Sequence, residues 1–226
     1  MLPFRFYLIT DTQGSRQDAT AAATAAATTA ATTTVALLPR LAQAGLRALQ
    51  IREKQLSPSA LADFCAALQT SLARISQDAP TPALYLNDRA DLALSLGLAG
   101  VHLREESLPL ALHAPELRRA LRFGVSTHSL AGVLAAEKAG ADFATFGPVF
   151  PTASKAAYGD PVGLRALEDA ARQTRLPLLA LGGVTPDRVA ECLAAGAHGV
   201  AAIGAVWNAP DPVAALRAFE KTLGGL

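Results

Sequence analysis

The chain is poor in cysteine and has no excess of charge of either sign, and both shortages exclude classes of protein. Its two cysteines, Cys65 and Cys192, lie in separate helical patterns, which excludes a disulfide framework and a zinc-binding spacing and predicts two buried thiols. Lys plus Arg number 20 and Asp plus Glu number 19, so the basic excess typical of a nucleic-acid-binding protein is missing. A small anion site needs only a few cations and stays open.

Long apolar runs and aromatic residues are scarce as well. No apolar run approaches the roughly 20 residues that cross a bilayer. The N-terminal segment has no apolar signal region with a cleavage site, so we expect a cytoplasmic protein without a membrane partner. With 51% hydrophobic but only 5% aromatic residues, the core is expected to consist of Ala, Leu and Val. The sequence leaves the oligomeric state open, a homo-oligomer included.

Short apolar runs alternate with amphipathic stretches along the chain. Several runs are continuously apolar, which is typical of parallel strands buried on both faces. The pattern predicts eight strands, at residues 4–9, 48–51, 83–86, 100–103, 123–126, 142–146, 178–181 and 199–203. It predicts eight helices, at residues 35–44, 58–73, 89–96, 115–121, 129–139, 162–173, 186–195 and 211–223.

This even alternation predicts an α/β fold, a (β/α)8 TIM barrel formed by one domain. The 226 residues fall within the roughly 200 to 250 of single-domain barrels. An open doubly wound sheet is the alternative, which the lack of Gly-x-Gly-x-x-Gly before the first helix disfavours. The boundaries are supported by cap residues before helices, at Ser57, Ser129 and Thr185, and by glycine after helices, at Gly45, Gly97, Gly140 and Gly196.

Residues 15–34 interrupt the pattern, because after Asp18 they are almost only Ala and Thr. Alanine favours helix, whereas threonine is β-branched and weakens it. One interpretation is an Ala/Thr-rich insertion after the first strand, either mobile or a helical extension without a core face. The other is an active-site lid, since a segment after the first strand of a barrel lies at the face where catalysis occurs.

Polar residues follow the second and third strands, and catalytic groups of barrels lie at the carboxyl ends of strands. If the chain stays extended after residue 51, alternation places Gln50, Arg52 and Lys54 on one side, which suits an anionic substrate. A surface ion-pair cluster with Glu53 is the alternative. Asp88 could bind Mg²⁺ through its carboxylate. Asn87 or Asp88 could instead cap the following helix.

The fifth strand ends near Ser126 and His128. His128 could act as a general acid or base, or it could donate to a backbone carbonyl and hold its loop.

The sixth strand leads into a loop with two hydroxyl groups and a lysine, at Thr152, Ser154 and Lys155. Neutral donors and a cation without a carboxylate are typical of a phosphate or diphosphate site. The seventh and eighth strands end in glycine, at Gly182, Gly183 and Gly204. Backbone amides at these two positions often bind phosphate in barrels.

Together these motifs resemble the thiamine-phosphate synthase family and its relatives, the thiazole tautomerases. The resemblance covers nearly the whole chain except the Ala/Thr-rich insertion. It depends on residues 50–54 (QIREK), 87–89 (NDR), 100–103 (GVHL), 124–128 (GVSTH), 147–152 (GPVFPT) with Ser154 and Lys155, and 182–184 (GGV). It implies the barrel fold and small phosphorylated substrates: a hydroxymethylpyrimidine diphosphate loses pyrophosphate as the nitrogen of a thiazole phosphate attacks its methylene carbon.

The resemblance also implies a role for each motif residue. The diphosphate would be held by Arg52, Lys54, Asn87, Thr152, Ser154 and Lys155. Asp88 would bind Mg²⁺. The pyrimidine would face Gln50 and Ser126. The thiazole phosphate would bind at Gly183, beside Gly182, and at the amides near Ile203 and Gly204.

Three positions depart from the synthase pattern. Ser107 occupies the place of an expected second Mg²⁺-binding aspartate, Gly204 replaces a serine, and Ser154 replaces a threonine. Loss of one carboxylate should weaken Mg²⁺ binding. A thiazole tautomerase, which needs no metal and would use His128 as its base, is therefore the alternative to a synthase. A non-catalytic relative that binds a phosphorylated ligand is a further alternative. Lys54, Asp88, Thr152 and Lys155 favour the synthase, because a tautomerase has no evident use for a diphosphate site.

Overall fold

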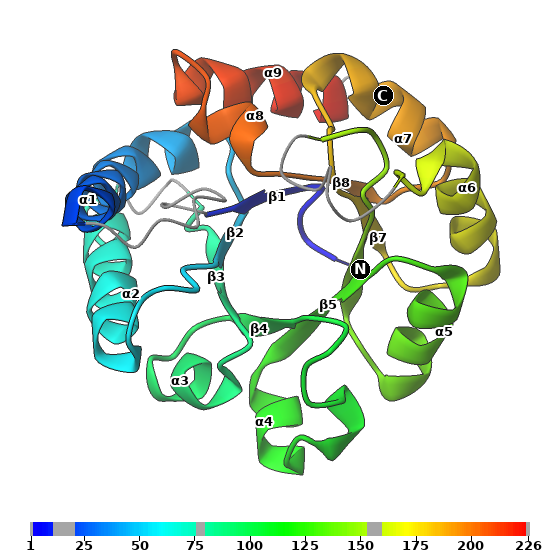
Figure 1. Ribbon diagram of the computed structural model, residues 1–226, viewed down its shortest axis with the longest axis horizontal. Coiled ribbons are helices and arrows are strands. Elements are labelled where there is room, and N and C mark those ends of the chain that lie inside the picture. The colour runs from blue at the N-terminus through cyan, green and yellow to red at the C-terminus, as the bar shows by residue number, and fades with distance from the viewer. Residues whose placement is uncertain (1, 11–20, 76–79, 153–159, 225–226) are drawn as a thin grey trace.

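The computed structural model describes residues 2–10, 21–75, 80–152 and 160–224. Eight parallel strands close into a barrel in sequence order, and β1 pairs with β8. Figure 1 looks down this barrel, with the helices in a ring outside the strands. The strands are β1 (Phe6–Ile9), β2 (Ala48–Ile51), β3 (Ala83–Asn87), β4 (Gly100–Leu103), β5 (Arg122–Thr127), β6 (Phe143–Phe146), β7 (Leu178–Ala180) and β8 (Gly199–Ala202). The predicted fold class is confirmed.

The helices cover the outside of the barrel. They are α1 (Ala21–Gln43), α2 (Pro58–Leu72), α3 (Ala90–Ser95), α4 (Pro115–Ala120), α5 (Leu130–Ala139), α6 (Gly163–Gln173), α7 (Val189–Ala194), α8 (Gly204–Trp207) and α9 (Pro212–Gly224), with two short 3-10 turns, η1 (Leu110–Leu112) and η3 (Pro186–Arg188). Among the described residues, no helix combines the length and apolar character needed to cross a membrane.

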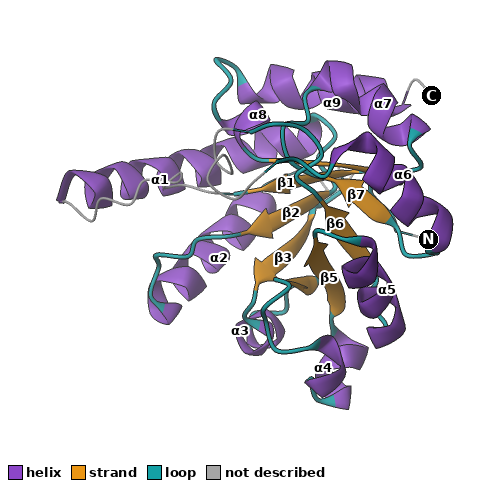
Figure 2. Cartoon of the chain, turned by 45° about the vertical axis from the view of Figure 1, so that its right-hand side comes forward, coloured by secondary structure: helices purple, strands orange, loops and turns teal. Residues whose placement is uncertain are grey.

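Helix α1 begins earlier than the predicted helix at 35–44. It runs without interruption from Ala21, so its first half belongs to the Ala/Thr-rich segment. Figure 2 shows α1 extending well beyond the neighbouring helix α2. The earlier part of the predicted insertion, residues 15–20, lies outside the described residues. A lid role for the segment stays a prediction.

Local signals in the sequence set most of the other boundaries. The hydroxyl of Ser57 accepts from the amide of Ala60 at 3.2 Å, and that of Ser129 accepts from Gly132 at 3.1 Å, so both serines cap helices as predicted. The four predicted exit glycines all have positive φ, at Gly45, Gly97, Gly140 and Gly196. Both cysteines are fully buried, and burial raises their thiol pKa values to about 11 for Cys65 and about 12 for Cys192.

Two hydrophobic cores result. The larger one fills the layer between strands and helices. The smaller one lies inside the barrel, where the rings of Tyr7, Tyr85 and Phe143 pack with centroids 5.3 to 5.6 Å apart. Phe4, from the segment before β1, packs on all three rings, with centroid separations from 5.4 to 5.8 Å. This aromatic cluster closes the amino-terminal half of the barrel interior.

Inward-facing positions change character along the strands. On β3 the inward residues are Tyr85 and then Asn87, and on β6 they are Phe143 and then Thr145, because side chains two residues apart share a face. The same step leads from Ala48 to Gln50 on β2. The interior is therefore apolar at the amino ends of the strands and polar at their carboxyl ends.

Candidate active site

A line of hydrogen bonds joins β2 to β3 at the carboxyl end of the barrel. Gln50 Nε2 donates to Asn87 Oδ1 at 3.3 Å, and Asn87 Nδ2 donates to Asp88 Oδ2 at 3.3 Å. Gln50 is 2% exposed, so its amide is held inside the barrel mouth. Parallel pairing of Gln50 with Tyr85 and of Asn87 with His102 places these side chains in neighbouring register. Three predicted site residues thus form one connected group.

Asp88 continues this line to the loop after β4. Its Oδ1 accepts from the Ser107 hydroxyl and, at 3.3 Å, from the Arg104 amide, which also donates to Ser107 Oγ at 2.9 Å; its Oδ2 accepts from Arg104 Nε as well as from Asn87. Among the described residues, Asp88 is the only non-glycine residue with positive φ, at 61°. The predicted helix cap is wrong: the cap position of α3 is Arg89, and no side chain bonds the helix start there. The side chain of Asp88 turns to the β4 loop instead.

The pKa of the Asp88 carboxyl reflects two opposing influences. Burial is the largest single influence and raises the pKa, but hydrogen bonds from Ser107 and Arg104 and the charge of Arg104 together outweigh it. The pKa is therefore lowered from its ordinary value, and the group is a carboxylate at neutral pH.

These donors bear on the Mg²⁺ ion that the resemblance implies. Mg²⁺ demands oxygen ligands in near-octahedral geometry and often uses one or two carboxylates. A carboxylate has about four acceptor positions; on Asp88 donors of Asn87, Arg104 Nε and Ser107 occupy three, and the shared Arg104 amide approaches the fourth. The residues at Asp88 do not fit a resident Mg²⁺ ion.

The second strand carries Arg52 and Lys54 to the same edge. The Arg52 amide donates to Thr10 Oγ1 at 2.9 Å, which fixes the end of β2 against the end of β1. The strand ends at Ile51 and the chain turns at 54–55, so the alternation expected through Lys54 does not continue. Arg52 is half-buried and Lys54 is exposed, whereas Glu53 is 7% exposed.

A second polar group joins β4, β5 and β6. His102 Nε2 lies 3.1 Å from Ser126 Oγ and 3.4 Å from Thr145 Oγ1. Burial lowers the pKa of His102 to about 3, against an opposing attraction from Asp88, so the ring is neutral. Gly124 makes room for it, because a Cβ there would lie 2.5 Å from His102 Nδ1. His102 is not among the predicted site residues, although its place two residues after Gly100, on the same strand face, indicates an inward position.

His128 lies at the end of β5, beside the loop that leaves β6. Its Nδ1 is in hydrogen-bond contact with the Gly147 carbonyl, so the ring donates from this nitrogen. The Gly147 amide in turn donates to the Thr127 carbonyl at 3.2 Å. These contacts match the predicted loop-holding arrangement. The general-base role stays a prediction.

The loops after β6 and β7 pack closely. The Phe150 amide donates to the Gly182 carbonyl at 3.0 Å. Gly182 and Gly183 both have positive φ, and a Cβ on Gly183 would lie 2.5 Å from the Pro151 carbonyl oxygen. Arg188, which the sequence analysis does not include, donates to the Gly183 carbonyl at 2.7 Å and stacks over the Phe150 ring at 4.6 Å.

The segment that makes these contacts continues into the predicted anion-binding loop. Thr152 is half-buried directly after this segment. Ser154 and Lys155 lie outside the described residues, so their roles stay predictions.

Ile203 and Gly204 follow β8, where helix α8 begins. Helix α8 has only four residues, so the phosphate-binding role of the amides near Ile203 and Gly204 stays a prediction. Trp207 Nε1 donates to the Ile9 carbonyl at 2.8 Å and ties α8 to β1. Because β7 pairs with β8, the Gly182–Gly183 loop and the Ile203–Gly204 turn leave neighbouring strands.

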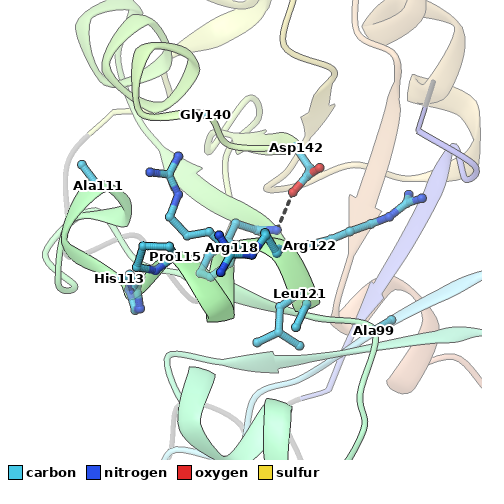
Figure 3. A pocket seen from close by; sticks show the side chains of 12 residues that line it. Ala99, Ala111, His113, Pro115, Arg118, Leu121, Arg122, Gly140 and Asp142 are labelled. Atoms are coloured by element: carbon cyan, nitrogen blue, oxygen red, sulfur yellow. Dashed lines mark hydrogen bonds between the residues drawn. The ribbon is translucent and has the colours of Figure 1, made fainter.

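A cavity of about 730 Å³ lies at the opposite end of the barrel. Figure 3 shows Arg118, Arg122, His113 and Asp142 among its lining side chains. Arg122 begins β5, and Asp142 immediately precedes β6, so this cavity lies at the amino ends of the strands. It contains none of the predicted site residues. Barrel enzymes bind substrate at the other face, so we assign no catalytic role to this cavity.

Comparison with known proteins shows the family. A family profile described as thiamine monophosphate synthase matches residues 6–206. The chain belongs to this family. Among curated relatives, a putative thiamine-phosphate synthase from Geobacter sulfurreducens is 40% identical, covering 97% of this chain and 94% of the relative. A thiamine-phosphate synthase from Shouchella clausii is 32% identical over 97% of this chain and 96% of the relative.

Solved structures agree. A thiamine phosphate pyrophosphorylase from Pyrococcus furiosus superposes with a TM-score of 0.77 at 27% identity, covering 98% of this chain and 96% of that one. A 3-hexulose-6-phosphate synthase superposes with a TM-score of 0.68 at 16% identity, which shows the shared fold alone. Family and relatives together support a role in thiamine biosynthesis, as a transferase.

Proposed function

We propose that this chain is a thiamine-phosphate synthase that joins hydroxymethylpyrimidine diphosphate to a thiazole phosphate and releases pyrophosphate. The proposal is supported by the family membership and by the names of the relatives. The observation that carries it is the hydrogen-bonded line from Gln50 on β2 through Asn87 on β3 to Asp88, which Ser107 joins from the loop after β4 at one barrel mouth. We further propose that the enzyme acts in the cytoplasm.

The reaction is a substitution at the methylene carbon of the pyrimidine. The bond from this carbon to the diphosphate oxygen breaks, and its electron pair leaves with the diphosphate. The lone pair of the thiazole nitrogen forms the new carbon–nitrogen bond. Negative charge grows on the leaving group, so fixed cations and hydrogen-bond donors around it lower the barrier.

In this proposal the cations Arg52, Lys54 and Lys155 stabilise the departing diphosphate. Neutral donors complete its binding, from Asn87, Thr152 and Ser154. Guanidinium and ammonium groups form charge-assisted hydrogen bonds to phosphate oxygens, which are stronger than neutral ones. Because the residues at Asp88 do not fit a resident Mg²⁺ ion, no step is assigned to one.

The pyrimidine is proposed to bind above the aromatic cluster, against Gln50 and Ser126. His102 holds the Ser126 hydroxyl at 3.1 Å and acts as a positioning residue. The thiazole phosphate is proposed to bind the amides of Gly183 and Gly204. His128 positions the loop after β6 through the Gly147 carbonyl.

The test incubates purified protein with both phosphorylated precursors, with and without Mg²⁺, and quantifies thiamine phosphate and pyrophosphate by mass spectrometry. We expect both products in equal amounts. Arg52→Gln should lower kcat/KM, whereas Arg172→Gln, on the outer helix α6 with a side chain 69% exposed, should leave it unchanged. Absence of product under every condition would refute the proposal. Metal-free isomerisation of a thiazole carboxylate phosphate, lost in His128→Ala, would establish the tautomerase alternative.

A further inference from the structure

Arg104 occupies the position next to Asp88 where the resemblance implies a divalent cation. Its Nε donates to the Asp88 carboxylate, and the Ser107 hydroxyl donates beside it. The Arg104 amide is shared between Ser107 Oγ at 2.9 Å and Asp88 Oδ1 at 3.3 Å. Ser107 therefore contacts Asp88. This contact is expected if Ser107 occupies the place of the second Mg²⁺-binding aspartate. One carboxylate and one guanidinium cancel in charge, just as two carboxylates and one divalent cation do.

The guanidinium has donors left for a ligand. Arginine carries five N–H donors, and Nε uses one of them on Asp88. Among the described residues, the two terminal nitrogens have no hydrogen-bond or ion-pair partner. The Arg104 side chain is 47% exposed, and that of Asp88 is 21% exposed. A guanidinium anchored through Nε presents a planar pair of terminal nitrogens, a geometry that matches phosphate oxygens.

Nearby carboxylates do not restore a metal site. Glu105 and Glu106 are exposed on the same loop. Glu105 Oε1 lies against the start of α5, 3.0 Å from where a Cβ on Gly132 would sit. The contacts of the Asp88 carboxylate are therefore with hydrogen-bond donors of the protein and not with a metal site completed by a second carboxylate.

We propose that Arg104 is the fixed cation of the diphosphate site, replacing the divalent ion at Asp88, so that this chain binds diphosphate without Mg²⁺. The inference rests on the proposed function, because it names a residue that contacts the same leaving group. Asp88 acts as the positioning residue that fixes the guanidinium plane through Nε. Ser107 and Asn87 complete the hydrogen bonds of that carboxylate.

The experiment measures binding of inorganic pyrophosphate by calorimetry in EDTA and then in Mg²⁺. We expect wild-type protein to bind in EDTA. Arg104→Ala should weaken this binding at least about tenfold, the loss of one hydrogen bond to a charged group. Arg172→Ala is the matched control, because it breaks an exposed arginine–glutamate pair on α6, and it should change nothing. Arg104→Gln, which keeps a donor for Asp88 without the charge, should weaken binding as Arg104→Ala does and guards against misfolding of the alanine variant.

A direct metal titration gives a second readout. Mn²⁺, followed by electron paramagnetic resonance without substrate, should bind the double variant Arg104→Ala, Ser107→Asp at least about tenfold more tightly than wild type. Pyrophosphate binding that requires Mg²⁺ in wild type, or that Arg104→Ala leaves within twofold, overturns the inference. Product formation from the two precursors reports the proposed function separately, so a Mg²⁺-dependent synthase unaffected by Arg104 would retain the function and remove only this inference.

Discussion

The Gly183 contact with the loop after β6 makes a quantitative prediction. Gly183 has a φ of 62°, and an alanine Cβ there would lie 2.5 Å from the Pro151 carbonyl oxygen and 2.8 Å from Phe150 Cβ. Gly97 has nearly the same φ, 63°, but nothing lies within 4 Å of its added Cβ. The pair therefore separates the cost of backbone conformation from the cost of steric overlap.

The magnitudes follow from these two terms. A left-handed conformation costs alanine roughly 1–2 kcal/mol, and the lower entropy of the unfolded chain returns about 0.4–1 kcal/mol. Gly97→Ala should thus destabilise the protein by about 1 kcal/mol. Gly183→Ala adds an overpacking cost of roughly 1–3 kcal/mol, since the neighbour is backbone and cannot rotate away. Its total should be about 2–4 kcal/mol.

The assay is urea denaturation of both variants beside wild type, combined with pyrophosphate binding. Because Phe150 and Pro151 lead directly to Thr152, Gly183→Ala should also weaken pyrophosphate binding, whereas Gly97→Ala should not. Equal destabilisation of the two variants, within about 0.5 kcal/mol, would show that the loop after β6 moves away from the added Cβ at little energetic cost. The close packing of these loops would then have no part in holding the anion site.

Three further predictions concern charge. Burial lowers the pKa of His102 to about 3 while the unfolded chain titrates near 6.5, so the stability gained from its neutral form is present above pH 6.5 and is lost as pH falls toward 3. Between pH 7.5 and 5.5 the free energy of unfolding should drop by about 1.4 kcal/mol more in wild type than in His102→Gln, as measured by denaturation at both pH values. Ser107→Asp alone should leave Mg²⁺ affinity within about twofold of wild type in calorimetry, because Arg104 still occupies the cation position at Asp88, and tenfold tighter binding would contradict that assignment. Lys155→Ala should weaken pyrophosphate binding by roughly 1.5–3 kcal/mol, and an unaltered affinity would contradict the anion-loop assignment.

Much of the barrel is predictable from the sequence because its signals are local. The ranges predicted for β2 and β4 agree with the structure at both ends, since each is a short stretch with a single polar residue between helix-exit and loop residues. The start of α1 is not predictable in this way, because Ala and Thr from residue 21 onward form no apolar face. Helix α8 has only four residues, which is too short to show helical periodicity.

The candidate site is predictable in part of its membership but not in its pairings. Strand ends identify Gln50, Asn87 and Asp88, because topology alone brings the carboxyl ends of parallel strands to one rim. The choice of Arg104 as the partner of Asp88 depends on the left-handed backbone at Asp88 and on the loop after β4. Both are tertiary features that one sequence does not encode as a pattern.

The barrel interior explains why the polar site ends at this depth. Below Gln50 and His102, the inward space is filled by the packed rings of Tyr7, Tyr85 and Phe143. A polar atom placed lower loses water without gaining a partner, and within the described part of the chain the Tyr7 hydroxyl and His102 Nδ1 already have none. In the proposed function, a pyrimidine ring bound in the mouth would stop above this layer, where Gln50 and Ser126 are proposed to supply its hydrogen bonds. The aromatic layer sets the depth of the proposed site, and it excludes water, which strengthens the electrostatic interactions directly above it.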